Sequence, residues 1–175
     1  MKKFWIQVVG LTSIFFIALW FYANHTALLN QIPTQNQPSA TPSDQNQLKI
    51  LDTVTNPNGA IIKAQISIEL ADTKEKRNLG LGGRESLATD AGMLFVYDNT
   101  DKHTFWMKGM RFPLDFIWIN ENRIVDLLPN IPNPTKDQSD DSLTRYQSTV
   151  VVNKVLEVNA GFIKNHNIRV GDKIE

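Results

Sequence analysis

The sequence predicts a mainly β domain, built as an antiparallel sandwich or barrel and carried behind an N-terminal membrane-spanning segment. Residues 62–70 alternate apolar and polar side chains, which is typical of a strand with one solvated face. Short apolar runs bounded by turn residues then recur between residues 92 and 174, whereas helical stretches are few and brief. Many short strands with few helices favour an antiparallel sandwich or barrel.

The first part of the domain is expected to form a hairpin followed by a short helix. Turn-forming residues separate a strand at 49–54 from the alternating strand at 62–70. A helix of about two turns should follow, because Asp72 and Glu75 have the spacing of a capping box. Gly80 suits the position just after that helix, where the backbone often becomes left-handed.

The remainder of the domain is expected to consist of short strands joined by turns. Strands are predicted at 92–97, 103–108, 114–119, 124–128, 149–152, 155–158 and 170–174. The strand at 114–119 is mostly apolar and therefore suits burial on both faces. Residues 98–101 read as a turn, 129–142 as a loop rich in proline, aspartate and serine, and 160–165 as a short helix.

The composition excludes several classes of function. The chain has 175 residues with 18 basic and 18 acidic side chains, and this balance disfavours a dedicated nucleic-acid-binding protein. It has no cysteine, which rules out disulfides, cysteine-based metal sites and a thiol nucleophile. Its three histidines lie far apart in the sequence, and we expect no metal and no cofactor. No phosphate-binding loop, dinucleotide fingerprint or nucleophile elbow is present.

The N-terminus is expected to anchor the chain in a membrane. Residues 1–3 carry two lysines and should stay in the cytoplasm, while 4–23 form an almost wholly apolar run. Twenty residues of helix span about 30 Å, the thickness of the hydrocarbon core of a bilayer. This predicts a single-pass signal anchor in the cell membrane with the rest of the chain extracytoplasmic, either periplasmic or on the cell surface. A cleaved signal peptide is the alternative, although its apolar region is usually shorter.

The anchor is expected to connect to the domain through a tether. Residues 24–47 are rich in proline, glutamine and serine, and such a segment buries too little apolar surface to offset the entropy of ordering it. We therefore predict a flexible tether at 24–47 and a folded β domain at 48–175.

Six short motifs of the domain resemble those of the DUF192 family, also called UPF0127. They are residues 80–84 (GLGGR), 92–95 (GMLF), 105–108 (FWMK), 113–116 (PLDF), 155–161 (VLEVNAG) and 170–172 (VGD). The resemblance implies a jelly-roll-like sandwich with one or two short helices, and it supplies no function. Gly82 stands where the family usually has methionine, and the loop near 130–134 lacks a cysteine that many relatives carry.

The stretch from 105 to 115 suggests a binding groove. An exposed Trp106 beside Lys108 would form a stacking platform with a cation, and Asp115 could accept hydrogen bonds from ligand hydroxyls. Arg84 follows two glycines and could hold an anionic group. These four residues predict a site for a small polar or saccharide-like ligand. The alternative is structural, with Trp106 packed in the core and Asp115 paired with Lys108, Arg84 or Arg111.

Glu157 is the second notable carboxyl group. Alternation places it on the same face of its strand as Val155, where a buried carboxylate needs an arginine or a backbone amide unless it is catalytic. Asp115 and Glu157 are the candidates for catalysis. They could form an acid–base pair for glycoside hydrolysis if their carboxyl groups lie within about 5–10 Å.

Together these observations predict a membrane-anchored, extracytoplasmic module for binding or an accessory role at the cell envelope. One alternative is a metal-independent hydrolase that acts on an envelope polymer or saccharide through paired carboxylates. Another is a structural partner of a different membrane protein. No feature of the sequence determines an oligomeric state.

Overall fold

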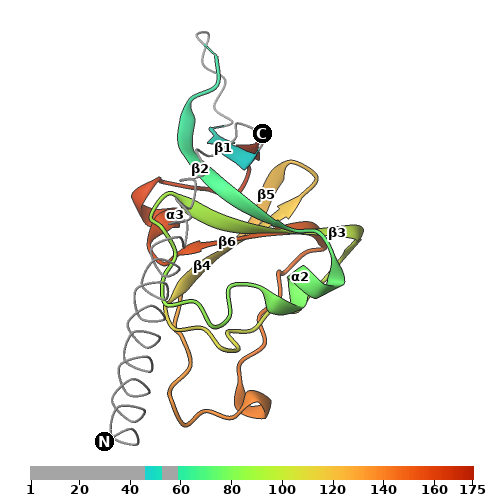
Figure 1. Ribbon diagram of the computed structural model, residues 1–175. Coiled ribbons are helices and arrows are strands. Elements are labelled where there is room, and N and C mark those ends of the chain that lie inside the picture. Colours follow the sequence, from blue (N-terminus) through green and yellow to red (C-terminus); the bar gives the residue numbers. More distant parts are fainter. Residues whose placement is uncertain (1–45, 53–58) are drawn as a thin grey trace, which may run out of the picture. The chain divides into compact units, whose positions relative to one another are not determined.

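The structure is a computed structural model that describes residues 46–52 and 59–175 (Figure 1). The anchor predicted at 4–23 and nearly all of the tether predicted at 24–47 lie outside the described residues. Within the described residues, no helix has the length and apolar character needed to cross a membrane.

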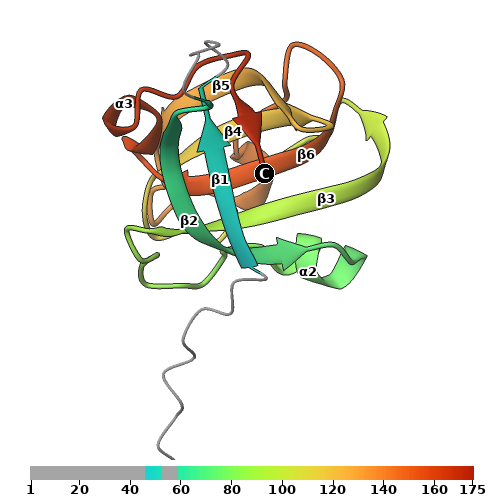
Figure 2. The same ribbon diagram turned by 90° about the horizontal axis from the view of Figure 1, so that it is seen from above.

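The described strands form a closed barrel, which Figure 2 shows from above. Their order around the ring is β1-β2-β3-β6-β4-β5-β7, and β7 pairs with β1 to close it. The strands are β1 (Gln47–Leu51), β2 (Ile62–Ala71), β3 (Ala91–Asp101), β4 (Leu114–Asn120), β5 (Arg123–Ile131), β6 (Val152–Asn159) and β7 (Lys173–Ile174). Two short α-helices, α2 (Lys74–Leu79) and α3 (Phe162–Asn165), and one 3-10 turn, η2 (Asp140–Ser142), complete the described elements.

The mainly β class with short helices is confirmed, but the jelly-roll-like sandwich is wrong. The ring closes because the two residues of β7 bridge β1 and β5, through the pairs Ile50↔Ile174 and Arg123↔Lys173. The pairing is also not wholly antiparallel. β2 and β3 run parallel, with Ser67 opposite Ala91, and a parallel pair requires a crossover connection, which here contains α2.

The predicted hairpin and first helix are present, with a different cap. β1 and β2 pair antiparallel, and Gly80 follows α2 with a φ of 51°. The N-cap is Thr73 rather than Asp72, since the Thr73 side chain accepts a hydrogen bond from the Lys76 amide at 3.3 Å. The Asp72 carboxylate instead pairs with the Lys76 ammonium at 2.7 Å, so the expected capping box does not form.

Three other elements differ from the prediction. Residues 98–101 continue β3 instead of turning. β6 begins at Val152, so it contains the strand expected at 155–158 but only the last residue of the strand expected at 149–152. The strand expected at 103–108 is absent, and only Phe105 makes an isolated bridge, to Tyr146. The apolar alternation in that stretch buries Phe105 and Met107 without a hydrogen-bonded ladder.

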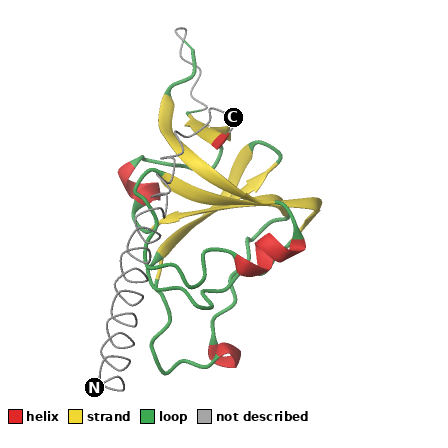
Figure 3. Ribbon diagram, viewed as in Figure 1, coloured by secondary structure: helices red, strands yellow, loops and turns green. Residues whose placement is uncertain are grey.

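The sheet buries apolar side chains on both faces, and this arrangement positions the site. One cluster draws on every strand and on α3, and fills the barrel. The other covers the opposite face of β3, β4 and β6 and includes Leu81, Phe105, Met107 and Met110 from loops. In Figure 3 the loops and α2 lie on this second side of the sheet. β6 alternates between the two clusters, with Leu156 and Val158 in the first and Val155 in the second.

Candidate functional site

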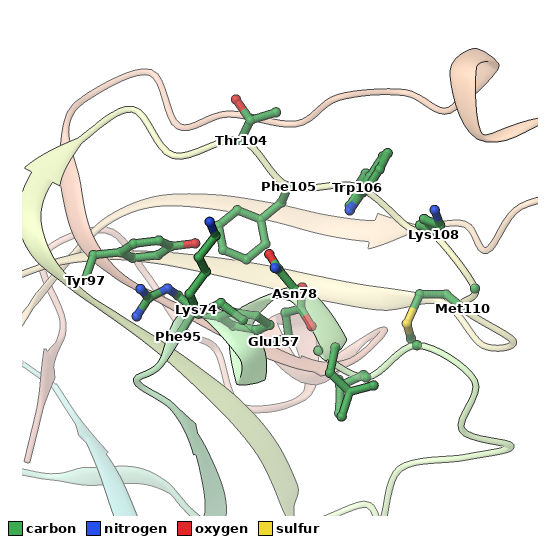
Figure 4. Close-up of a pocket in the computed structure, with 16 residues that line it drawn as sticks. Lys74, Asn78, Phe95, Tyr97, Thr104, Phe105, Trp106, Lys108, Met110 and Glu157 are labelled. Carbon is green, nitrogen blue, oxygen red and sulfur yellow. The ribbon is translucent and has the colours of Figure 1, made fainter.

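A cavity of about 600 Å³ lies beside α2, on the side of the sheet that carries the second apolar cluster. Its walls come from α2 and the glycine-rich turn after it, from β3, from the segment 104–110, and from Glu157 on β6. Figure 4 shows Tyr97 at one end of the cavity, Trp106 and Lys108 at the other, and Glu157 between them in this view. The volume is in the range typical of sites for small molecules.

Close backbone approach joins two walls of this pocket. The Gly83 amide donates a hydrogen bond to the Gly109 carbonyl at 2.8 Å, and both glycines have positive φ. A Cβ atom at Gly82 would lie 3.1 Å from the Lys108 carbonyl oxygen. The departure from the family methionine therefore has a structural consequence, because the missing side chain lets the turn lie directly against the segment that carries Lys108.

Glu157 is the buried acid of the pocket. It sits opposite Met93 of β3 and Phe116 of β4, and it is 5 % exposed. No described residue forms a hydrogen bond or ion pair with its carboxyl group, so the expected arginine or amide partner is absent. Burial raises the pKa of Glu157 to about 8. The carboxyl group is therefore mostly protonated at pH 7 and able to donate a hydrogen bond into the cavity.

A cationic and aromatic wall faces Glu157 from α2 and β3. Lys74, Arg77 and Asn78 share one face of α2 and line the pocket together. The Arg77 guanidinium donates to the carbonyls of Asp72 and Val96 at 2.8 and 2.7 Å, and lies 4.9 Å from the Tyr97 ring centroid. Burial raises the pKa of Tyr97 to about 12, and this effect outweighs the opposing one of the nearby Arg77 guanidinium. The phenol is thus neutral throughout the physiological range.

None of these wall residues was predicted from the sequence to belong to a site. A signal existed for three of them, because residues 74, 77 and 78 fall on one face of the helix that was predicted over this segment. Tyr97 had no such signal, since it appeared only as the end of an apolar strand.

Trp106 and Lys108 come together at the other end of the pocket. Trp106 is 39 % exposed, and the Lys108 ammonium lies 5.2 Å from its ring centroid. The Arg145 guanidinium is closer, at 3.7 Å, and the Lys108 ammonium also pairs with Asp140 at 2.6 Å. The indole ring is therefore already in contact with two cations of the protein itself.

Arg84 lies away from this cavity. Its guanidinium makes a two-pronged ion pair with Glu69, with one contact at 2.8 Å. The hydrogen bond from Arg84 lowers the pKa of Glu69, and the same bond raises the pKa of Arg84. Glu85, which follows Arg84 in the sequence, pairs with Arg111.

Asp115 is also outside the pocket, and its carboxylate is fully used by the backbone. It is 0 % exposed and accepts hydrogen bonds from the amides of Asn130, Gly161 and Ile163 at 2.8, 3.1 and 2.8 Å. These contacts tie β4 to the end of β5 and to the start of α3. The expected pairs with Lys108, Arg84 or Arg111 do not form, because the surrounding donors are backbone N–H groups.

Asp115 and Glu157 do not share a cleft. Asp115 is paired with Val158 and Phe116 with Glu157, so the two carboxyl groups project from opposite faces of the sheet. The structure therefore brings Trp106, Lys108 and Glu157 into one pocket and leaves Arg84 and Asp115 outside it.

The charges of the pocket favour anions over metal ions. Lys74, Arg77 and Lys108 line it, and Glu157 is the one acidic side chain among the described lining residues. Within residues 46–52 and 59–175, no three histidine, aspartate or glutamate side chains group as metal ligands would.

The comparisons with known proteins agree with the barrel. Two crystal structures are similar to this chain, each at 27 % identity over 74 % of it. One is a protein from Sinorhizobium meliloti with a provisional assignment as a transcription regulator, of which 91 % is covered at a TM-score of 0.62. The other is a protein of unknown function from Novosphingobium aromaticivorans, of which 83 % is covered at a TM-score of 0.60. No curated protein matches the sequence. The model of the DUF192 family, described as "Uncharacterized ACR", matches residues 53–175, and the chain therefore belongs to the DUF192 family.

Proposed function

We propose that this DUF192 chain is a membrane-anchored, extracytoplasmic binding or accessory module, and that the pocket beside α2 binds a small polar or saccharide-like ligand. The observation that carries the proposal is Glu157, which is 5 % exposed and lines the cavity with no partner for its carboxyl group among the described residues. An apolar side chain would stabilise the fold better at this position, since burying an unpaired polar group is unfavourable. A ligand that hydrogen bonds to Glu157 accounts for its presence.

Binding is better supported than hydrolysis. A paired-carboxylate mechanism needs two acids that flank one bond, and the described lining residues include Glu157 alone. A purely structural partner role is less well supported, because the described domain has a pocket with polar groups directed into it.

The envelope location is supported by the sequence. The lysines at positions 2 and 3, together with the apolar run at 4–23, have the pattern of a signal anchor that exports the rest of the chain. Carbonate-resistant membrane association, with the domain open to added protease from outside the cell, is the expected result. A soluble exported product would contradict the anchor.

The binding proposal is tested on the full chain in detergent micelles. Isothermal titration calorimetry with glucose, N-acetylglucosamine, glucuronate and citrate should detect at least one ligand. Binding should be lost in Glu157→Leu, whose apolar side chain fills the same space. Glu75→Gln is the matched control, because Glu75 is an exposed acid of α2 outside the pocket lining. Circular dichroism establishes that each variant is folded. Failure of all four ligands, or binding that survives Glu157→Leu, would overturn the proposal.

A further inference from the structure

We infer, on the basis of the proposed function, that the ligand is an organic anion. Its negative group would lie beside Lys74 and Arg77 of α2, and a second oxygen of the same molecule would accept a hydrogen bond from Glu157. Lys108 adds positive charge at the other end of the pocket. The class includes sugar acids and sugar phosphates, and it excludes amines.

The first support is that the cations of the pocket are poorly neutralised. Among the described residues, the Lys74 ammonium has no carboxylate partner. The hydrogen bonds of the Arg77 guanidinium go to two backbone carbonyls, which carry no net charge. Lys108 is the exception, with Asp140 at 2.6 Å. The pocket thus retains an excess of positive charge that an anion would balance.

The second support is the state of Glu157. The titratable and charged groups that line the cavity with it are Tyr97 from β3, Lys74 and Arg77 from α2, and Lys108 from the following loop. Burial keeps Glu157 protonated at pH 7, with a pKa of about 8, so it offers a donor and no negative charge. A protonated amine would be repelled by these three cations and would have no ionised carboxylate among the described lining residues to pair with.

The third support comes from Trp106. A bare indole face would favour stacking of a neutral sugar, yet Arg145 already lies 3.7 Å from this ring centroid and Lys108 lies 5.2 Å from it. The tryptophan therefore holds positive charge at this end of the pocket as well as offering apolar surface. The two cations leave less of the indole face open for stacking of an uncharged sugar ring, and they add to the positive charge around the pocket.

The test is a series of ligands with one skeleton and different charges. Glucosamine, glucose, glucuronate and glucose 6-phosphate are titrated into the full chain in micelles at pH 7. We expect the two anions to bind at least about tenfold more tightly than glucose, and glucosamine to bind more weakly than glucose. Preference for glucuronate or for glucose 6-phosphate then assigns the anionic group as carboxylate or phosphate.

Charge variants locate the anion in the pocket. Lys74→Gln should weaken the affinity for glucuronate and for glucose 6-phosphate by about fivefold or more. The affinity for glucose should change by less than about twofold. Lys136→Gln is the matched control, since Lys136 is an exposed lysine outside the pocket lining. Equal loss in both variants would contradict binding of the anion at Lys74.

A pH series tests the role of Glu157. Affinity for glucuronate should fall about five- to tenfold between pH 7 and 9, because Glu157 loses its proton and becomes negatively charged over this interval. Glu157→Gln keeps a donor and should remove this dependence. Equal affinity for all four sugars, or a preference for glucosamine, would overturn the anion inference and leave the binding module intact. Failure of every sugar and of citrate would overturn the proposed function itself.

Discussion

Asp115 and Glu157 are two buried acids of the same sheet that differ in the hydrogen-bond donors around them. Asp115 faces the start of α3 and receives three backbone N–H groups. Glu157 faces the pocket and receives none from the described residues. Burial alone therefore does not separate a structural acid from a functional one. The number of partners does, and it indicates that Asp115 holds the fold together while Glu157 is available to a ligand.

The largest effect is expected at Asp115. Asp115→Ala removes the acceptor of three buried amides, and should lower the free energy of unfolding by about 3–5 kcal/mol. Urea unfolding of the full chain in micelles, followed by near-UV circular dichroism, measures this loss. Asp137→Ala, at an exposed position, should change stability by less than about 0.5 kcal/mol. A loss below about 1 kcal/mol at Asp115 would remove the contrast between the two regions.

Glu157 should make the free energy of unfolding depend on pH. The folded state holds the Glu157 proton until about pH 8, whereas the unfolded chain releases it near pH 4.5. The unfolded state thus binds fewer protons between these values, and stability falls as pH rises, by up to about 1.4 kcal/mol per pH unit. In Glu157→Gln this slope should be absent. Urea unfolding from pH 5 to 9 measures it, and identical slopes in both proteins would show that Glu157 is ionised in the fold.

A smaller effect should follow from loosening the wall opposite Glu157. Thr73 caps α2, which carries Lys74, Arg77 and Asn78 to the pocket. Thr73→Ala should lower stability by about 1 kcal/mol, and Thr73→Ser should retain most of it. Thermal unfolding measures both variants. If the alanine variant matches the wild type, the cap does not support this wall.

The smallest effect is expected at Arg84, outside both regions. Its ion pair with Glu69 is largely solvent-exposed, so Arg84→Ala should change stability by less than about 1 kcal/mol. Ligand binding in the pocket should remain within about twofold of wild type. A large loss of binding would show that the site extends beyond the lining residues to Arg84.

Local patterns predicted the strands that have a clear period and missed the features that depend on distant contacts. The alternation over 62–70 and the apolar run at 114–119 led directly to β2 and β4. Closure of the barrel was not predictable in this way, because it rests on two residues of β7 that pair with β1 more than a hundred positions earlier. The alternation near Phe105 was misleading, since burial against the second cluster produces the same pattern as a strand.

The site was predictable in part, for similar reasons. Trp106, Lys108 and Glu157 stand out as residue types and do meet in one pocket. Asp115 stood out equally, yet its partners are backbone amides. Nearly every residue has a backbone amide, so the residue types do not show which ones will bind a carboxylate. Lys74 was overlooked because a lysine on an exposed helix is ordinarily just solvated.

The position of β7 at the end of the chain has a consequence for the folding of this domain during its synthesis. β7 spans only Lys173–Ile174 and joins the ring between β1 and β5. A nascent chain that has not yet reached residue 173 can form at most an open sheet, with β1 and β5 as unprotected edges. Such edges invite pairing with other chains, so the interval before β7 arrives is the period when this domain is most exposed to misassembly.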